Sequence, residues 1–98
     1  MVLISYTAIK KFIDKHPEAT DVCNNWYRLF ENADCNSFHE MKNLFNSVDS
    51  VGNDRYVFNV GGGNYRIVAM IFFDIRTVFI RKVLLHKDYD RIKDVSLV

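Results

Sequence analysis

The sequence predicts an α+β domain in which two N-terminal helices pack on an antiparallel sheet. Residues 5–32 carry apolar side chains at helical spacing, whereas residues 55–85 form three strand-like apolar runs separated by two turn signals. Helices followed by a run of strands are typical of a two-layer α+β fold. With 98 residues, 49% of them hydrophobic and 26% charged, we expect a single domain over residues 1–98.

The first half of the chain is expected to hold a short strand and three helical segments. Ser5 is a candidate N-cap for the first helix, which should end at His16 because the residue before Pro17 disfavours the α region. Ser37 and Glu40 have the spacing of a reciprocal helix cap. The expected segments are a strand at Val2–Ile4, a helix from Ser5 to His16, a helix over Glu18–Asn32 and a shorter helix from Ser37.

The second half is expected to form a three-stranded meander. Val48–Asp54 is polar and contains glycine, which predicts a loop before it. The expected strands are Arg55–Val60, Tyr65–Phe73 and Arg76–Leu85, and a short final helix is expected over Lys87–Ile92. The turn Gly61–Asn64 also invites comparison with a phosphate-binding loop, but a strand follows it where such a loop needs a helix, so we interpret it as a hairpin turn.

Turn lengths predict which side chains share a face of this sheet. A four-residue loop at Gly61–Asn64 pairs Asn59 with Arg66, and a turn at Asp74-Ile75 pairs Val68 with Arg81. One face then holds Arg55, Val57, Asn59, Arg66, Val68 and Arg81. The other holds Tyr56, Phe58, Val60, Tyr65, Ile67, Ala69, Ile71, Phe73, Ile80 and Leu84, and we expect it to pack on the helices. A bulge in either hairpin would change this grouping, and Lys82 falls on the apolar side.

Arg66 and Arg81 are the clearest candidates for function. Arginine inside a half-buried strand is unfavourable unless an anion or partner meets it, and a guanidinium group binds phosphate well. His86 and Tyr89 follow the last strand, where the imidazole is a candidate general acid or base. The structural alternatives are cross-strand ion pairs for the arginines and a packing role for Tyr89. A metal site at His86 is disfavoured because no fourth ligand has suitable spacing.

Composition narrows the setting in which the chain works. Cys23 and Cys35 are too few and too far apart for a disulfide framework, and they fit reduced thiols in a cytoplasmic protein. The N-terminus lacks the basic region of a signal peptide, and no apolar run approaches the length of a membrane span. The net charge of +1 does not compel a nucleic-acid partner, so any RNA must bind through a local basic patch.

The motifs of the C-terminal half resemble those of HigB toxins of bacterial type II toxin–antitoxin modules. The residues that carry the resemblance are Tyr56-Val-Phe-Asn59, Gly61-Gly62, Tyr65-Arg66, Ile80-Arg81 and His86-Lys-Asp-Tyr89-Asp90, together with Ile4–Pro17 and Trp26. The resemblance implies the RelE/ParE fold, in which two N-terminal helices pack on a curved antiparallel sheet. The chain departs from the family pattern in one respect, because RelE-like toxins are usually strongly basic and this chain is nearly neutral.

The resemblance implies an mRNA endoribonuclease that commonly acts on the ribosome, needs no metal or organic cofactor and is silenced by a HigA-like antitoxin. Arg66 and Arg81 would stabilise the phosphoryl charge, with His86 as acid or base and Tyr89 as its partner or as a stacking platform. Arg55, Asn59, Lys82 and Lys87 are the candidate RNA contacts. A ParE-like inhibitor of DNA gyrase shares the fold and remains the alternative, as does a relic without activity.

Overall fold

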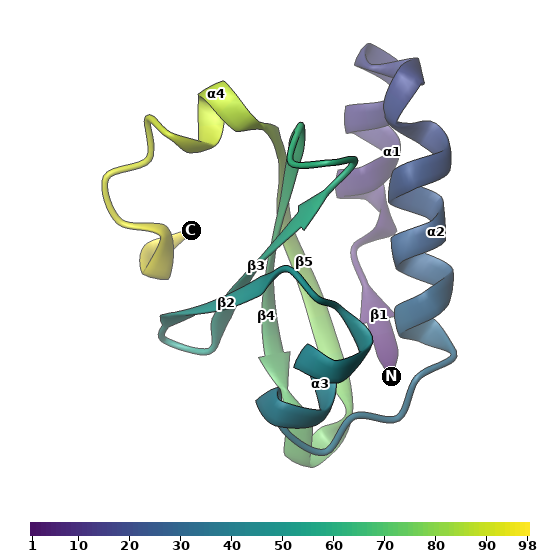
Figure 1. Ribbon diagram of the computed structural model, residues 1–98, viewed down its shortest axis with the longest axis vertical. Helices are drawn as coiled ribbons and strands as arrows, with labels where there is room; N and C mark the ends of the chain where they lie inside the picture. Colours follow the sequence, from purple (N-terminus) through teal and green to yellow (C-terminus); the bar gives the residue numbers. More distant parts are fainter.

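The computed structural model describes residues 1–98 as a five-stranded sheet between a layer of helices and the C-terminal segment of the chain (Figure 1). The strand order is β1-β5-β4-β3-β2, and the strands are β1 (Val2–Ile4), β2 (Val48–Gly52), β3 (Arg55–Val60), β4 (Tyr65–Phe72) and β5 (Thr77–Leu85). All neighbours are antiparallel except β1, which runs parallel to β5. The predicted α+β class is confirmed, although the sheet is mixed rather than purely antiparallel.

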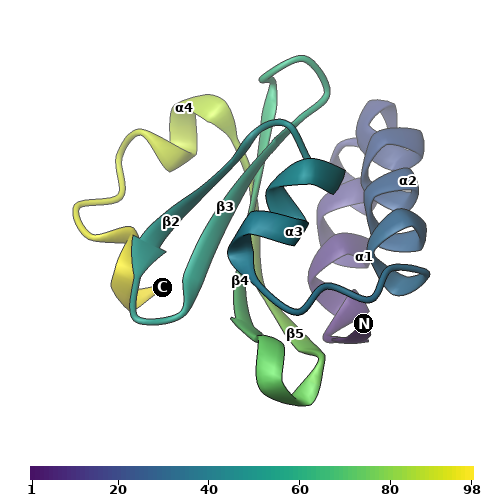
Figure 2. The same cartoon turned by 60° about the horizontal axis from the view of Figure 1, so that its bottom comes forward.

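Two helices cover one face of the sheet, and Figure 2 shows the C-terminal segment on the opposite side. The helix α1 (Tyr6–Lys15) ends before Pro17 as predicted, but Ser5 has a left-handed backbone and its side chain makes no capping bond. The helix α2 (Thr20–Glu31) begins later than predicted, because Pro17–Ala19 forms a separate 3₁₀ turn. The Thr20 hydroxyl donates to the Pro17 carbonyl at 2.7 Å and so closes this 3₁₀ turn.

The short helix α3 (Phe38–Leu44) begins with the predicted pair of capping residues. The Glu40 N–H donates to Ser37 Oγ at 3.2 Å. The Glu40 carboxylate in turn accepts from the Asn36 N–H at 3.3 Å, one residue earlier than in the standard reciprocal cap. The two side chains therefore satisfy one backbone donor in the first turn of the helix and one just before it.

The loop predicted over Val48–Asp54 is wrong, because most of it forms the edge strand β2. Val48 is buried opposite Phe58, which gives the strand one firm anchor in an otherwise polar segment. The connection to β3 places Asn53 and Asp54 at positive φ, the backbone of a tight hairpin turn. With so few apolar residues, the segment lacks the periodicity by which strands are predicted.

The predicted register of the first long hairpin is confirmed, since Asn59 pairs with Arg66 and Val60 with Tyr65. The second hairpin begins in the predicted register, with Ala69 opposite Ile80, and then slips by one residue between Ala69 and Val68. The slip is a β-bulge at Arg81, which is left without a partner in the ladder.

The bulge corrects two of the predicted faces of β5. Lys82, rather than Arg81, pairs with Val68, and Leu84, rather than Val83, pairs with Arg66. Leu84 therefore shares a face with Arg66, and the prediction that it packs in the core is wrong. Val83 and Leu85 take the core-facing positions and pack against the buried cluster. The bulge thus lets β5 bury apolar residues at both ends and present Lys82 outward.

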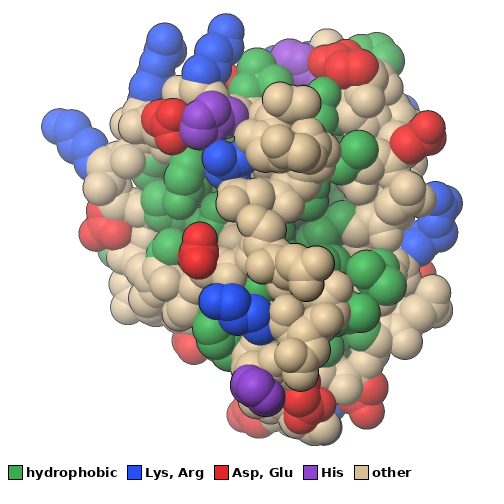
Figure 3. All heavy atoms as spheres, viewed as in Figure 1, with side chains coloured by type: hydrophobic (Ala, Val, Ile, Leu, Met, Phe, Trp, Pro, Cys, Tyr) green, Lys and Arg blue, Asp and Glu red, His purple; other side chains and the backbone are tan.

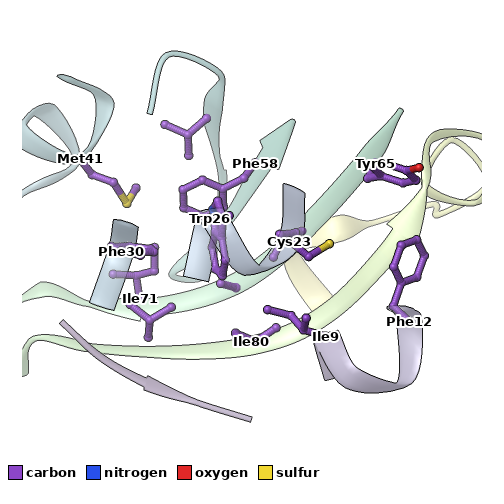
Figure 4. Packing of buried hydrophobic residues seen from close by; sticks show 14 of the residues in the cluster. Ile9, Phe12, Cys23, Trp26, Phe30, Met41, Phe58, Tyr65, Ile71 and Ile80 are labelled. Carbon is purple, nitrogen blue, oxygen red and sulfur yellow. The ribbon is translucent and has the colours of Figure 1, made fainter. Parts of the chain in front are cut away.

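The main core lies between the sheet and the helices (Figure 4). Its largest contributors from the helices are Ile9, Trp26 and Phe30, which pack against Phe58 and Ile71 of the sheet. Both cysteines are free and buried in or beside this cluster. The predicted core face is thereby confirmed for the strand residues Phe58, Tyr65, Ile67, Ala69, Ile71 and Ile80.

The other face of the sheet is covered in part by the segment that follows β5. The helix α4 (His86–Tyr89) contacts β4 and β5, and the 3₁₀ turn η3 (Val95–Leu97) contacts β2. The helix was predicted to reach Ile92, but its hydrogen bonds change to the 3₁₀ type at Arg91 and Ile92. Val57 and Val68 pair on this face and are fully buried outside the main core. None of the helices is long and apolar enough to cross a membrane.

Candidate functional site

The second residue of β4, Arg66, is held by the backbone of the glycine turn that precedes it. Its Nη1 donates to the carbonyl oxygens of Gly63 at 2.6 Å and Tyr65 at 3.2 Å. Gly61, Gly62 and Gly63 all have positive φ, which glycine adopts without strain, and this path turns the Gly63 carbonyl toward the guanidinium. No acidic side chain neutralises Arg66, so its charge remains available to an anion.

His86 meets the same guanidinium group. Arg66 Nη2 lies 2.8 Å from His86 Nδ1. The backbone of His86 is held there because its main-chain N–H donates to the Asn64 carbonyl at 3.0 Å. A guanidinium group has donors only, so Nδ1 must be the acceptor and the ring proton lies on Nε2. On the other side of the ring, Nε2 lies 3.3 Å from Oδ2 of Asp90.

Tyr89, the last residue of α4, is the third member of the cluster. Its ring centroid lies 5.8 Å from Cζ of Arg66, a cation–π distance. Burial raises the pKa of Tyr89, the nearby Arg66 opposes that rise, and Asp49 and Asp90 add to it. The hydroxyl group is therefore protonated at neutral pH and is a hydrogen-bond donor rather than a base.

The fold brings some of the other predicted residues to this face. Asn59 lies opposite Arg66, although its amide donates to Ser47 Oγ at 2.8 Å. Lys82 lies on the same face in the neighbouring strand β5, where it pairs with Val68, and it is exposed. Lys87 is exposed beside His86 on α4. These residues surround the cluster of Arg66, His86 and Tyr89.

The fold does not bring Arg81 or Arg55 into that cluster. Arg81 is exposed in the bulge, and its side chain makes no hydrogen bond or ion pair. Arg55 shares the face of Asn59, but four residues of strand separate them by roughly 13 Å. Its side chain donates instead to the carbonyl oxygens of Val98 and Asn53, each at 3.0 Å. Of the two predicted catalytic arginines, Arg66 alone contacts His86.

Sequence reasoning missed two parts of this arrangement. The sequence predicts a turn at Gly63 but no contact for its carbonyl group, and it presents Asp90 only as part of a motif. The spacing was the signal available for their contact, because Asp90 follows His86 by four residues and His86 directly precedes the expected helix Lys87–Ile92. The structure gathers no group of three His, Cys, Asp or Glu side chains that could hold a metal ion.

Charge is distributed unevenly over the chain. Residues 81–93 hold five basic side chains (Arg81, Lys82, Lys87, Arg91, Lys93) against two acidic ones (Asp88, Asp90). Residues 16–40, which include α2, hold one basic side chain (Arg28) against five acidic ones (Glu18, Asp21, Glu31, Asp34, Glu40). Figure 3 shows Lys and Arg side chains projecting over α4 and the segment after it, around exposed apolar side chains. A net charge of +1 thus conceals a basic region beside Arg66.

Comparison with known proteins agrees with the motifs. A family model described as HigB_toxin, RelE-like toxic component of a toxin-antitoxin system, matches residues 19–92. The mRNA interferase toxin HigB of Escherichia coli strain K12 is 34% identical over 100 residues, which cover 92% of this chain and 88% of that protein. The mRNA interferase HigB of Escherichia coli O6:H1 strain CFT073 is 29% identical over 94 residues, which cover 94% of this chain and 91% of that protein.

Proposed function

The chain belongs to the HigB family of RelE-like toxic components of toxin–antitoxin systems, and we infer that it is an mRNA endoribonuclease. We propose that the cluster of Arg66, His86 and Tyr89 is its active site. The observation that carries this proposal is the 2.8 Å contact between Arg66 Nη2 and His86 Nδ1. It joins a phosphate-binding group to the unprotonated nitrogen of an imidazole.

Arg66 retains the donors needed to bind the scissile phosphate. Of its five N–H groups, two donate to carbonyl oxygens and one to His86, which leaves Nε–H and one Nη2–H. Two donors on one edge of the guanidinium fit two phosphoryl oxygens. The contact from Nη2 to His86 is proposed to open as the RNA binds, because the 2′-hydroxyl competes with Nη2 for the lone pair of Nδ1.

The chemical step then needs no group outside the RNA and these side chains. His86 Nδ1 takes the proton of the 2′-hydroxyl, and the 2′-oxygen forms a bond with the adjacent phosphorus. The bond from phosphorus to the 5′-oxygen breaks, which leaves a 2′,3′-cyclic phosphate and a 5′-hydroxyl after the leaving oxygen gains a proton. Arg66 stabilises the negative charge that develops on the phosphoryl oxygens.

Tyr89 is the proposed donor to the leaving 5′-oxygen, since burial keeps its hydroxyl protonated. Solvent or the imidazolium of His86 returns the proton afterwards. Arg81, Lys82 and Lys87 are proposed to bind neighbouring phosphates of the RNA backbone. Arg81 lies three residues along β5 from the partner of Arg66, roughly 10 Å, which suits a phosphate beyond the scissile one. Asn59 and Arg55 are proposed as weaker contacts on the same face.

The family also indicates the partners. A HigB toxin is controlled by a cognate antitoxin, and mRNA is its substrate. We place the protein in the cytoplasm and propose that it cleaves mRNA on the ribosome, where the local basic region would contact RNA phosphates. Gyrase inhibition is not proposed, because a pure binder has no use for an imidazole lone pair beside an arginine.

The test is to incubate the purified chain with an mRNA alone and with the same mRNA on translating ribosomes, and to map the new ends. We expect 5′-hydroxyl and 2′,3′-cyclic phosphate ends, with cleavage stronger in the ribosome arm. Cleavage in both arms at equal rates would remove the ribosome from the proposal. Intact mRNA together with inhibited gyrase supercoiling would overturn it.

A further inference from the structure

We propose that Asp90 is the residue that positions His86 for catalysis, by accepting the Nε2–H of the imidazole. The kinetic consequence of this inference rests on the proposed ribonuclease function. Nothing in the sequence motifs or in the family comparison assigns this carboxylate a role.

The two side chains are within ion-pair distance, and the imidazole nitrogen that faces the carboxylate is Nε2. His86 Nδ1 accepts from Arg66, so Nε2 carries the ring proton, and Asp90 Oδ2 lies 3.3 Å from it. The Asp90 N–H donates to the His86 carbonyl at 3.1 Å, which keeps the two residues one helical turn apart. The contact at Nε2 is an ion-pair contact, it is the only one that the Asp90 carboxylate makes, and no other acceptor contacts Nε2.

Stability does not explain the pair. The side chains of His86 and Asp90 are 54% and 57% exposed, and an ion pair at such a site stabilises a fold by about 0–1 kcal/mol. The pair matters instead for the orientation of the His86 ring, because the ring must present Nδ1, and not Nε2, to the phosphate held by Arg66. A carboxylate on Nε2–H selects that tautomer and that ring orientation.

Asp90 also offsets the charge that the reaction creates. When Nδ1 takes the 2′-hydroxyl proton, the ring becomes an imidazolium next to the guanidinium of Arg66. The charged groups that face the ring are Arg66 from β4 and Asp90 from the C-cap of α4, and the neutral Tyr89 lies beside Arg66. The carboxylate keeps its own charge and its contact with Nε2–H, so it stabilises the imidazolium without taking up a proton.

The kinetic experiment compares Asp90→Ala with Asp88→Ala. Asp88 lies in α4, two residues before Asp90, and its side chain makes no hydrogen bond or ion pair, so Asp88→Ala controls for the loss of one negative charge near the RNA. We expect kcat to fall roughly 10–100-fold in Asp90→Ala, with KM within about twofold of the Asp88→Ala value. Asp90→Asn, whose amide oxygen still accepts a hydrogen bond, should recover part of the loss. Equal kcat values in Asp90→Ala and Asp88→Ala would overturn the inference.

A second measurement does not depend on RNA cleavage. In ¹⁵N-labelled wild-type protein, we expect imidazole NMR correlations of His86 to show the proton on Nε2, with its resonance retained by the bond to Asp90. The resonance should be lost to solvent exchange in Asp90→Ala and kept in Asp88→Ala. A proton on Nδ1, or an Nε2–H unaffected by Asp90→Ala, would overturn the inference even if the enzyme is active. Inactive wild-type protein with the expected spectra would reject the ribonuclease function alone.

Discussion

Replacing Arg66 with alanine should abolish most RNA cleavage while leaving a folded protein. The structure leaves two of its five N–H donors free for the phosphate, and each charge-assisted hydrogen bond contributes about 1.5–3 kcal/mol. Removal of one donor from an oxyanion site raises the barrier by about 3 kcal/mol, which corresponds to roughly 100-fold in kcat. We therefore expect Arg66→Ala to lose about 100-fold or more.

Arg66→Lys separates charge from geometry. Lysine keeps the positive charge, but its single ammonium group cannot bind two phosphoryl oxygens and the Gly63 carbonyl at the same time in the geometry of a guanidinium group. We expect its kcat to lie between those of the wild type and Arg66→Ala. A lysine variant as slow as the alanine variant would show that the fork, and not the charge, is what cleavage requires.

The assay is single-turnover cleavage of an end-labelled mRNA, followed together with urea unfolding of each variant. Arg66 is half-buried and its hydrogen bonds contribute about 1 kcal/mol each, so a modest loss of stability should accompany the loss of rate. Arg28→Ala is the matched control, because Arg28 is exposed on α2 and bonds only to Asn25. Wild-type cleavage by folded Arg66→Ala would refute the assignment of this active site.

Three further outcomes follow from the structure. Tyr89→Phe keeps the ring beside the guanidinium but removes the protonated hydroxyl, so kcat should fall at least 10-fold with little change in stability, as measured by cleavage and thermal unfolding. Burial raises the pKa of Cys23 from 9.0 to about 11, so the folded state holds the thiol proton more tightly than the unfolded state does. The free energy of unfolding should therefore fall by on the order of 2 kcal/mol between pH 9 and pH 11. Urea titrations of Cys23→Ala should show a shallower fall over the same pH range. Gly61→Ala should destabilise the fold more than Gly62→Ala, because a Cβ at Gly61 would lie 2.7 Å from the Tyr65 ring whereas one at Gly62 meets nothing; equal unfolding midpoints would contradict this.

Much of the fold was predictable because it follows local patterns. The helical spacing of Ile9 and Phe12 and of Trp26 and Phe30 predicted two helices that bury those side chains. The glycine turn gave the first long hairpin its register, since its length leaves one way to pair the flanking strands. The edge strand β2 escaped prediction because a polar strand with one buried valine has no alternation to detect.

The candidate site was predictable in its residue types and less so in its geometry. Arg66, His86 and Tyr89 stood out as polar groups bordering apolar strands, and the structure places them in contact. Arg81 stood out for the same reason, yet it lies in the bulge and outside the cluster. Asp90 did not stand out, because an exposed aspartate after a histidine is common and acquires meaning only from what the imidazole contacts.

Apart from the edge strand β2, the sequence by itself determined which segments are helical or extended. It also determined which face of the first hairpin is apolar and that basic residues are concentrated after residue 80. These are properties of neighbours in the chain, set by side-chain periodicity and turn backbone. Only the tertiary structure decided the parallel pairing of β1 with β5, the bulge at Arg81 and the line of contacts from Arg66 through His86 to Asp90. Each of these depends on how segments far apart in sequence share buried area and hydrogen bonds. At the bulge, burial of Val83 and Leu85 against the core contributes more than one further pair in a regular ladder of hydrogen bonds. The register therefore shifts by one residue, and Lys82 comes to lie on the face of Arg66.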